Sequence, residues 1–219
     1  MTTYGIMQAR IADDFVNESI TTAQIKNAIQ SSIASYENTL LYFNQKIATF
    51  STTNDEYYGS TDLADIPNII RIRSAEISNG TYYTPLEAVD FNVIDDAQSG
   101  SVLGQPYWFS TFAQQIRLYP MPNAVFTVRL SYNYKFATLV DDADTNAWMT
   151  DGEELIRQAA KRRLALDILH SDKMAERCQI LENEALDGLR QETRQRLPNT
   201  TLRIPSMIKT RSFNILTGV

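Results

Sequence analysis

The chain has 219 residues, of which 43% are hydrophobic and 21% charged, so its composition is that of an ordinary globular protein that buries its own core. Its apolar runs stay far below the ~18 residues that a membrane-spanning helix needs, so we expect no membrane insertion. Residues 1–15 lack the basic start and the apolar stretch of a secretory signal, so we expect a protein made in the cytoplasm. A net charge of −6 argues against a general nucleic-acid-binding protein, and a single cysteine, Cys178, with a single histidine, His170, argues against disulfide and zinc chemistry.

Charge is unevenly distributed along the chain. Residues 50–150 hold twelve acids against five bases, a net charge of −7, whereas residues 197–219 hold three bases and no acid. An acidic middle and a basic end favour contact between one subunit and another.

The first part of the chain is predicted to be helical. A weak pattern predicts a short first helix that ends near Asn17, and Thr21 and Thr22 are natural N-caps for the next one. Seven apolar residues then follow at steps of three or four, which predicts one long amphipathic helix. They are Ile25, Ile29, Ile33, Tyr36, Leu40, Phe43 and Ile47.

After Phe50 the composition becomes polar and rich in turn-forming residues, and the helical period is lost. Runs rich in β-formers flank Asn79-Gly80, the dipeptide that best tolerates the positive φ angles of a type I′ turn. Two strands joined as a hairpin are therefore expected here.

The stretch IRLYPMPNAVFTVRLSYNYKF, residues 116–136, predicts a second hairpin. Residues 116–119 and 124–136 alternate between apolar and polar side chains as half-buried strands do, and the prolines of residues 120–123 suit the connecting turn. One face of the longer strand is expected to point outward, available to a neighbouring subunit or another protein. Its residues are Val125, Thr127, Arg129, Ser131, Asn133 and Lys135.

Helix is expected again after Trp148. Thr150 or Asp151 can cap it, and a glutamate three residues on completes a capping box. A break near His170 separates this helix from a second one, and two helices with so short a connection normally pack antiparallel. Cys178 lies on the apolar stripe of the last helix, where a cysteine is usually an inert small hydrophobic residue.

The strongest candidate for site chemistry is an acidic run before this helix pair. Its oxygen-bearing side chains occupy positions 1, 3, 5, 9 and 12 of an EF-hand calcium loop, but position 6 is Ala147 rather than glycine. An acidic turn followed by a capped helix explains the same residues. They are Asp142, Asp144, Asn146, Thr150 and Glu153.

Other candidates for catalysis are weaker. Acid pairs such as Asp95-Asp96 could serve hydrolysis only if burial raised one pKa, and their loop positions indicate solvation. Arg157, Lys161 and Arg162 are expected on a solvated helix face, and His170 at a helix end is expected to be a cap or a surface residue. We therefore expect no enzyme activity, cofactor or metal.

Residues 197–219 form an extended C-terminal tail in this interpretation. The tail contains large apolar residues between prolines and lacks acids, so it either binds another surface or packs on its own domain. The residues expected to make such a contact with a neighbouring protein are Leu202, Arg203, Ile204, Met207, Ile208, Lys209, Arg211, Phe213, Ile215 and Leu216.

In element order the chain resembles the head-to-tail connector, or adaptor, proteins of tailed bacteriophages, especially short-tailed phages. The resemblance rests on an N-terminal helical region, the stretch IRLYPMPNAVFTVRLSY, the segment LVDDADTNAWMTDGEELIRQAAKRRLALDIL and a last helix. It implies a twelve-fold ring seated beneath the portal, with a tail or nozzle protein below and DNA passing through the centre. It also implies a place in the neck of the virion, and it carries no active site.

The sequence therefore predicts a structural α+β protein: a helical bundle, made of a long N-terminal helix and a C-terminal helix pair, with an inserted antiparallel β module and an extended tail. The bundle is expected to comprise residues 1–50 and 148–196, the β-rich module 51–147 and the tail 197–219. Two alternatives remain at this point. One is a calcium-binding or carboxylate-using hydrolase, and the other is a distal tail protein that binds a host glycan through Tyr107, Trp108 and Tyr119.

Overall fold

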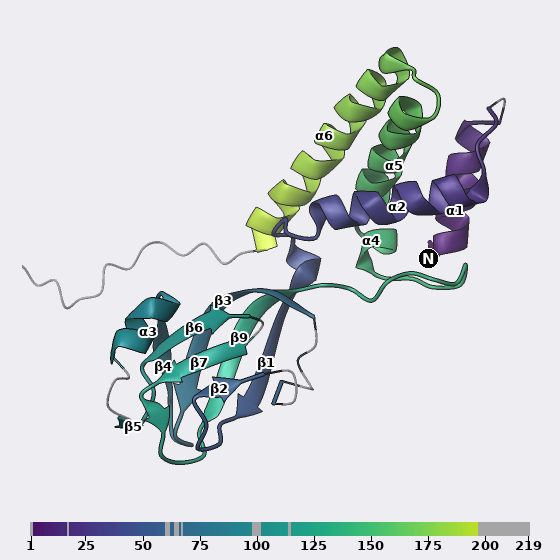
Figure 1. Cartoon of the computed structure of the whole chain (residues 1–219). Coiled ribbons are helices and arrows are strands. Elements are labelled where there is room, and N and C mark those ends of the chain that lie inside the picture. Colours follow the sequence, from purple (N-terminus) through teal and green to yellow (C-terminus); the bar gives the residue numbers. More distant parts are fainter. Residues whose placement is uncertain are drawn as a thin grey trace, which may run out of the picture.

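A helical part and a sheet part lie side by side in the computed structural model, which describes residues 2–16, 18–59, 62–63, 66, 68–97, 102–113 and 115–196 (Figure 1). Both ends of the described chain belong to the helical part, and the sheet part is formed by residues between them. Among the described residues, no helix combines the length and the apolar composition needed to cross a bilayer.

The helical part begins with two helices whose first turns are capped by threonine. α1 (Tyr4–Asp14) has Thr3 as its N-cap, and α2 (Thr22–Tyr36) starts with a capping box between Thr21 and Gln24. Each threonine side chain accepts a hydrogen bond from a backbone amide that would otherwise lack a helical partner.

Three more helices complete this part: α4 (Ala147–Thr150), α5 (Glu153–Asp167) and α6 (Asp172–Arg196). The expected antiparallel packing of the last two is confirmed, since α5 and α6 contact one another along their lengths and α2 lies against α5 (Figure 1). A core that includes Tyr4, Ile29, Trp148 and Ile156 holds these helices together. The expected capping box at Glu153 is wrong, because Asn146 caps the separate helix α4 and the N-cap of α5 is Gly152.

The sheet part contains seven strands in the order β1-β9-β3-β4-β6-β7-β2. They are β1 (Gln45–Ser51), β2 (Tyr57–Tyr58), β3 (Ile69–Ser78), β4 (Tyr83–Ala88), β6 (Trp108–Phe112), β7 (Gln115–Tyr119) and β9 (Thr127–Tyr134). All of their pairings are antiparallel except that of β4 with β6. A two-stranded parallel sheet of β5 (Leu103–Gly104) and β8 (Met121–Pro122), a helix α3 (Phe91–Ala97) and a 3₁₀ turn η1 (Tyr42–Asn44) complete the described elements.

The large sheet curls into a half-barrel (Figure 1). Its two outermost strands, β1 and β2, are joined by residues 52–56 alone, so the far ends of the strand order must come close together. The rings of Phe50 and Tyr58, one from each end, lie 5.3 Å apart. The inside of the curl is a second apolar core, separate from that of the helices, with Ile77, Leu118 and Val128 fully buried.

The expected fold, a helical bundle with an inserted antiparallel β module, is wrong. Among the described residues, the seven-stranded half-barrel dominates a mixed fold with six helices. The long N-terminal helix is also shorter than expected, because α2 ends at Tyr36 and residues 45–51 form β1. Ile47, counted in the helical stripe, is 67% exposed on β1, whereas Phe50 enters the core of the sheet. The division of the chain into units at residues 50, 147 and 196 stays a prediction.

One of the two expected hairpins is confirmed. β3 and β4 pair around Asn79 and Gly80, and Gly80 has the positive φ of 99° that favours glycine, although residues 79–82 make a four-residue connection instead of a two-residue turn. The second hairpin is wrong: β7 pairs with β6 and β2, whereas β9 lies between β1 and β3. The prolines at 120 and 122 instead carry the chain through β8 to a different place in the sheet.

Candidate interaction surfaces

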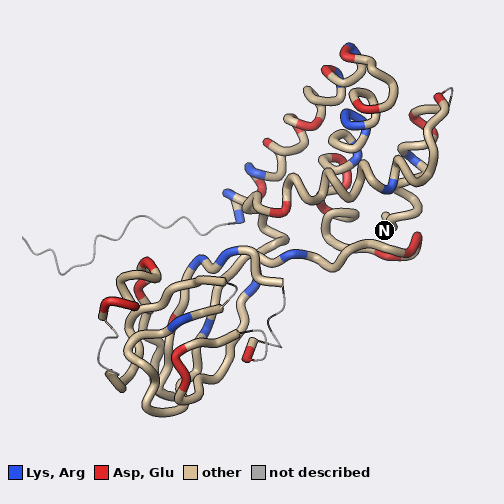
Figure 2. Tube along the Cα trace, viewed as in Figure 1, with Lys and Arg blue, Asp and Glu red and all other residues tan. Residues whose placement is uncertain are grey.

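The acidic loop before α4 binds the N-terminus of the chain. The backbone amides of Tyr4 and Gly5 donate to the carbonyl oxygens of Asp144 and Asp142, at 2.8 and 2.9 Å. Glu153 accepts a hydrogen bond from the Thr2 hydroxyl at 2.7 Å and forms an ion pair with Arg10 of α1. Figure 2 shows this acidic loop beside the N-terminus.

The carboxylates of the suspected calcium loop have protein partners. Asp142 Oδ1 lies 3.1 Å from both the Lys26 ammonium and the Gln8 amide nitrogen, and these two hydrogen bonds lower the pKa of Asp142. Asp144 accepts from the backbone amides of Val140 and Asp141, which lowers its pKa as well. Within the described ranges, no three His, Cys, Asp or Glu side chains gather as a metal site requires.

Cationic side chains expected on a solvated face of α5 instead join helices. Arg162 forms an ion pair with Glu182 of α6, whose exposed fraction is 3%, and Glu182 also accepts a hydrogen bond from the Tyr36 hydroxyl of α2. Burial and this hydrogen bond raise the pKa of Tyr36 to about 12. Lys161 Nζ lies 3.0 Å from Asp14 Oδ2 at the end of α1. The expectation of a solvated face is therefore wrong for Lys161 and Arg162.

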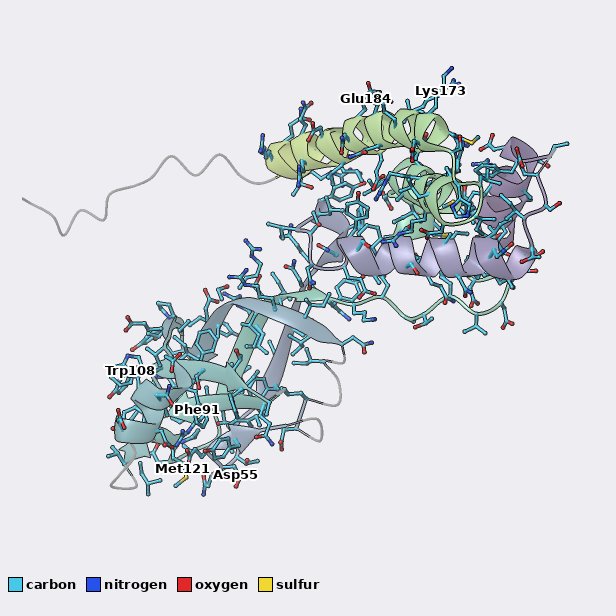
Figure 3. The ribbon with its side chains drawn as sticks, turned by 45° about the horizontal axis from the view of Figure 1, so that its top comes forward. Asp55, Phe91, Trp108, Met121, Lys173 and Glu184 are labelled. Carbon is cyan, nitrogen blue, oxygen red and sulfur yellow. The ribbon has the colours of Figure 1, made fainter. Side chains whose placement is uncertain are left out.

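The lone histidine and cysteine lie as the sequence predicted. His170 is exposed in the turn between α5 and α6 and has a left-handed φ of 48°. Cys178 is buried on α6, and burial raises the pKa of its thiol, which keeps the thiol protonated and unreactive. The outer side of α6 carries charged residues such as Lys173 and Glu184, which point away from the helical part (Figure 3).

The face of β9 expected to point outward is only partly free. Arg129 forms an ion pair with Glu76 of β3 and lies over the Tyr83 ring at 4.1 Å, while Lys135 pairs with Glu37 at 3.1 Å. Asn133 is buried, and Thr127 and Ser131 are half-buried. Val125, just before the strand, is the one residue of this set that is largely exposed, at 74%. β9 is a central strand, so its edges are also occupied by β1 and β3.

A buried arginine on the outer face of the sheet was not foreseen. Arg117 of β7 is only 3% exposed and forms ion pairs with Glu56 and, at 3.1 Å, with Asp95 of α3. Its guanidinium lies 5.0 Å from the Tyr57 ring centroid and 4.9 Å from that of Phe91. These contacts join the segment before β2 and helix α3 to the sheet. Asp95 is therefore a partner of this arginine, while its own side chain stays 64% exposed, so the expected solvation of this acid is confirmed.

The three aromatic residues considered for glycan binding do come together. The rings of Trp108 and Tyr119 stack with centroids 5.6 Å apart, Tyr107 meets both rings edge-on, and the indole nitrogen of Trp108 donates to Glu87 at 3.1 Å. Because Trp108 and Tyr119 present their faces to each other, this cluster offers less open stacking surface than three separate rings would. Tyr107 is half exposed, at 49%.

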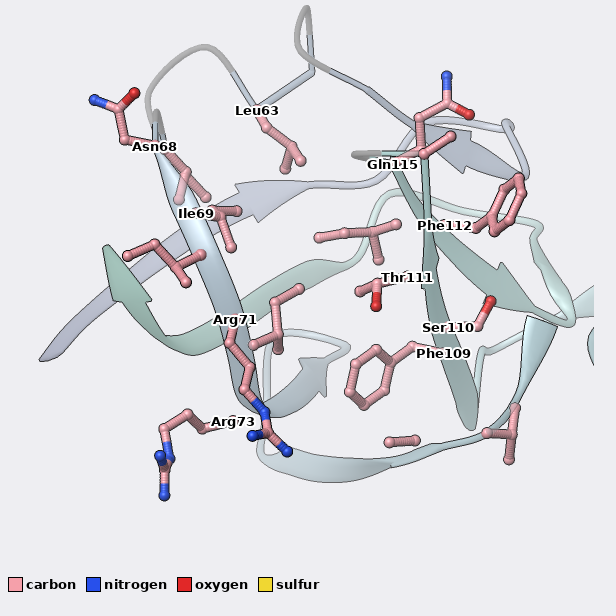
Figure 4. Close-up of a pocket in the computed structure, with 17 residues that line it drawn as sticks. Leu63, Asn68, Ile69, Arg71, Arg73, Phe109, Ser110, Thr111, Phe112 and Gln115 are labelled. Carbon is pink, nitrogen blue, oxygen red and sulfur yellow. The ribbon is translucent and has the colours of Figure 1, made fainter. Parts of the chain in front are cut away.

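A cavity of about 780 Å³ opens in the sheet part between the first half of β3 and β6 (Figure 4). Leu63, Ile66, Ile72, Phe109 and Ile116 supply its apolar walls, and no sequence pattern predicted this cavity. The exposed residues Arg71 and Arg73 lie on the β3 side.

A family model described as SU10 adaptor protein matches residues 2–205. The chain belongs to the SU10 adaptor protein family. The match spans every helix and strand described above, and it confirms the resemblance drawn from the element order. No curated protein matches the chain.

The adaptor is thus a structural component of a phage virion that interacts with other virion components. The ten tail residues expected to make such contacts, Leu202 to Leu216, lie outside the described residues. The matched range reaches 205 and so includes the first three of them.

Proposed function

We propose that this adaptor assembles as a ring, twelve-fold in symmetry, which joins the portal of the phage head to the tail. The family match over residues 2–205 carries the proposal, since an adaptor acts by contact with other virion proteins. In such a ring each subunit presents one surface to the neighbour on one side and a different surface to the neighbour on the other side. The rotation between successive subunits closes the ring.

The C-terminal segment after α6 is proposed to make a large share of these contacts. α6 ends beside the start of the sheet part, where the Arg196 guanidinium lies 3.8 Å from the Tyr42 ring centroid. The residues that follow are apolar and basic without an acid. A segment of this kind gains free energy by burying its apolar side chains on an acidic surface of a neighbouring subunit or of the portal.

DNA is proposed to pass through the centre of the ring without sequence-specific binding. The net charge of −7 over residues 50–150 supports this, because acidic walls repel a polyanion and let it slide. We also propose that the adaptor has no enzyme activity. The carboxylates nearest to a catalytic or metal-binding arrangement, those of Asp142, Asp144 and Glu153, hold the N-terminus and the loop itself.

Native mass spectrometry of the full chain, alone and with purified portal, tests the proposal. We expect a closed ring on the portal, and we expect deletion of residues 198–219 to leave a folded monomer by circular dichroism that no longer joins the portal. The charge reversal R203E/K209E/R211E should weaken association, whereas R203K/R211K should not. Failure of the full chain to associate with portal would contradict the proposal. Unfolding of the truncated chain would show that residues 198–219 belong to the core of their own subunit.

A further inference from the structure

The first half of β3 has one unoccupied edge in the described structure. β3 pairs with β9 from Ile69 to Ser78 but with β4 only from Ala75 to Ser78. β6 in turn pairs with β4 only at Trp108 and Phe109. Residues 69–74 and 110–112 thus face each other across a seam in the sheet, in which the described residues form no ladder.

The 780 Å³ cavity occupies this seam. In Figure 4, Phe109 and Thr111 of β6 face it from one side and Ile69 and Arg71 of β3 from the other. β3 also has two register irregularities against β9, between Ile69 and Arg71 and between Ile72 and Ser74. Such bulges are common where a strand is shaped for a binding site instead of for continuous pairing. A free strand edge beside an apolar cavity is the arrangement that binds an extended peptide by adding a strand.

The charges at the seam indicate what kind of peptide fits. Arg71 and Arg73 are exposed, and no carboxylate of the described chain lies within ion-pair distance of either, whereas Arg117 and Arg129 of the same sheet are both paired. Two such guanidinium groups favour a carboxylate-bearing occupant. The adaptor's own residues 197–219 carry three bases and no acid, so these arginines repel them.

We propose that the seam takes up an extended, acid-bearing segment of a second virion protein as an added β-strand. Its backbone pairs with residues 69–74 of β3, its apolar side chains enter the cavity, and its carboxylates contact Arg71 and Arg73. The inference rests on the proposed function, which locates that partner protein in the neck of the virion. It goes beyond that function by assigning the docking site and the chemistry of the segment that fills it.

Photo-cross-linking in intact virions tests the site. A photoreactive phenylalanine analogue replaces the exposed Thr111 of β6 in the full chain. The exposed Thr49 of β1, an outermost strand of the sheet, receives it as the control. We expect position 111, and not 49, to yield a cross-linked peptide from another virion protein with Asp or Glu within a few residues. The inference would be overturned if position 111 cross-linked only to residues 197–219 or only to DNA. It would also be overturned if virions that contain the adaptor yielded no cross-link. Absence of the adaptor from virions would instead count against the proposed function.

A binding measurement with the cross-linked sequence as a synthetic peptide tests the mode of docking. We expect R71E/R73E to weaken its affinity by at least about tenfold, since charge-assisted contacts are lost, and K46E on β1 to leave it unchanged. Hydrogen exchange should show protection of the amides of residues 69–74 when the peptide binds. Equal affinity for the two variants, or no protection, would overturn strand addition at this seam.

Discussion

The backbone amide of Gly5 donates a hydrogen bond to the carbonyl oxygen of Asp142 at 2.9 Å, and a Cβ on Gly5 would lie only 2.8 Å from the Cβ of Asp142. Helix α1 therefore docks on the acidic loop by direct contact of two backbones. The glycine is required by this close approach.

Replacing Gly5 with alanine is expected to destabilise the helical part by about 1 to 3 kcal/mol, because the added methyl group forces two backbones apart. Gly188 is the matched control: it lies within α6 and has nothing within 4 Å of its Cβ position, so Gly188→Ala should stabilise by about 1 kcal/mol through helix propensity. Urea unfolding measures both changes. Equal effects of the two substitutions would contradict the described docking of α1.

Removal of the buried arginine should destabilise the sheet part. Arg117→Met is expected to cost about 2 to 4 kcal/mol, since Glu56 and Asp95 lose their cationic partner and Glu56 stays largely buried. The exposed Arg73→Met should change the free energy of unfolding by less than about 0.5 kcal/mol. Thermal unfolding of both variants provides the comparison. A neutral Arg117→Met would show that the cluster does not stabilise the attachment of α3 and β2.

The junction of α2, α5 and α6 depends on Glu182. Glu182→Gln should destabilise by about 2 to 3 kcal/mol, because Arg162 keeps its charge in a partly buried site without a carboxylate. Glu184→Gln, two residues along the same helix and exposed, should have little effect. Equal unfolding midpoints for the two variants in urea would count against this account of the junction.

Alkaline pH is expected to unfold the helical part. The pKa values of Tyr36 and Tyr42 are raised from 10.0 to about 12, by burial first and then by hydrogen bonds to Glu182 and Asp151. Because the folded state holds these protons more tightly than the unfolded state does, the stabilisation is complete below pH 10 and is lost as pH rises toward 12. Tyr36→Phe and Tyr42→Phe should make the fall in stability less steep in unfolding measured between pH 9 and 12. An unchanged slope would contradict the raised pKa values.

Local signals in the sequence predicted the elements that depend on local contacts. The helix pair after Trp148, the threonine cap of α2 and the turn at Gly80 each follow from a few neighbouring residues. The family resemblance likewise came from the order of such elements. The prediction of one long N-terminal helix failed because Ile47 continues the helical spacing by chance, while the pairing of residues 45–51 with β9 decides its conformation.

The arrangement of the sheet could not be read from local pattern. β1 pairs with a strand about eighty residues away along the chain, and β7 pairs with β6 and β2 instead of with the adjacent β9. The burial of Arg117 follows from the position of α3 over the sheet, and the seam beside Arg71 follows from the divergence of β3 and β4. Both arise from long-range packing, which alternation and spacing do not encode.

An image of the phage neck at side-chain resolution tests the central claim most directly. The account predicts a single ring of adaptor subunits between portal and tail, with residues after Arg196 in contact with a neighbouring subunit or the portal and DNA in the channel. Finding the adaptor at the distal end of the tail, or as isolated subunits that do not touch the portal, would contradict it.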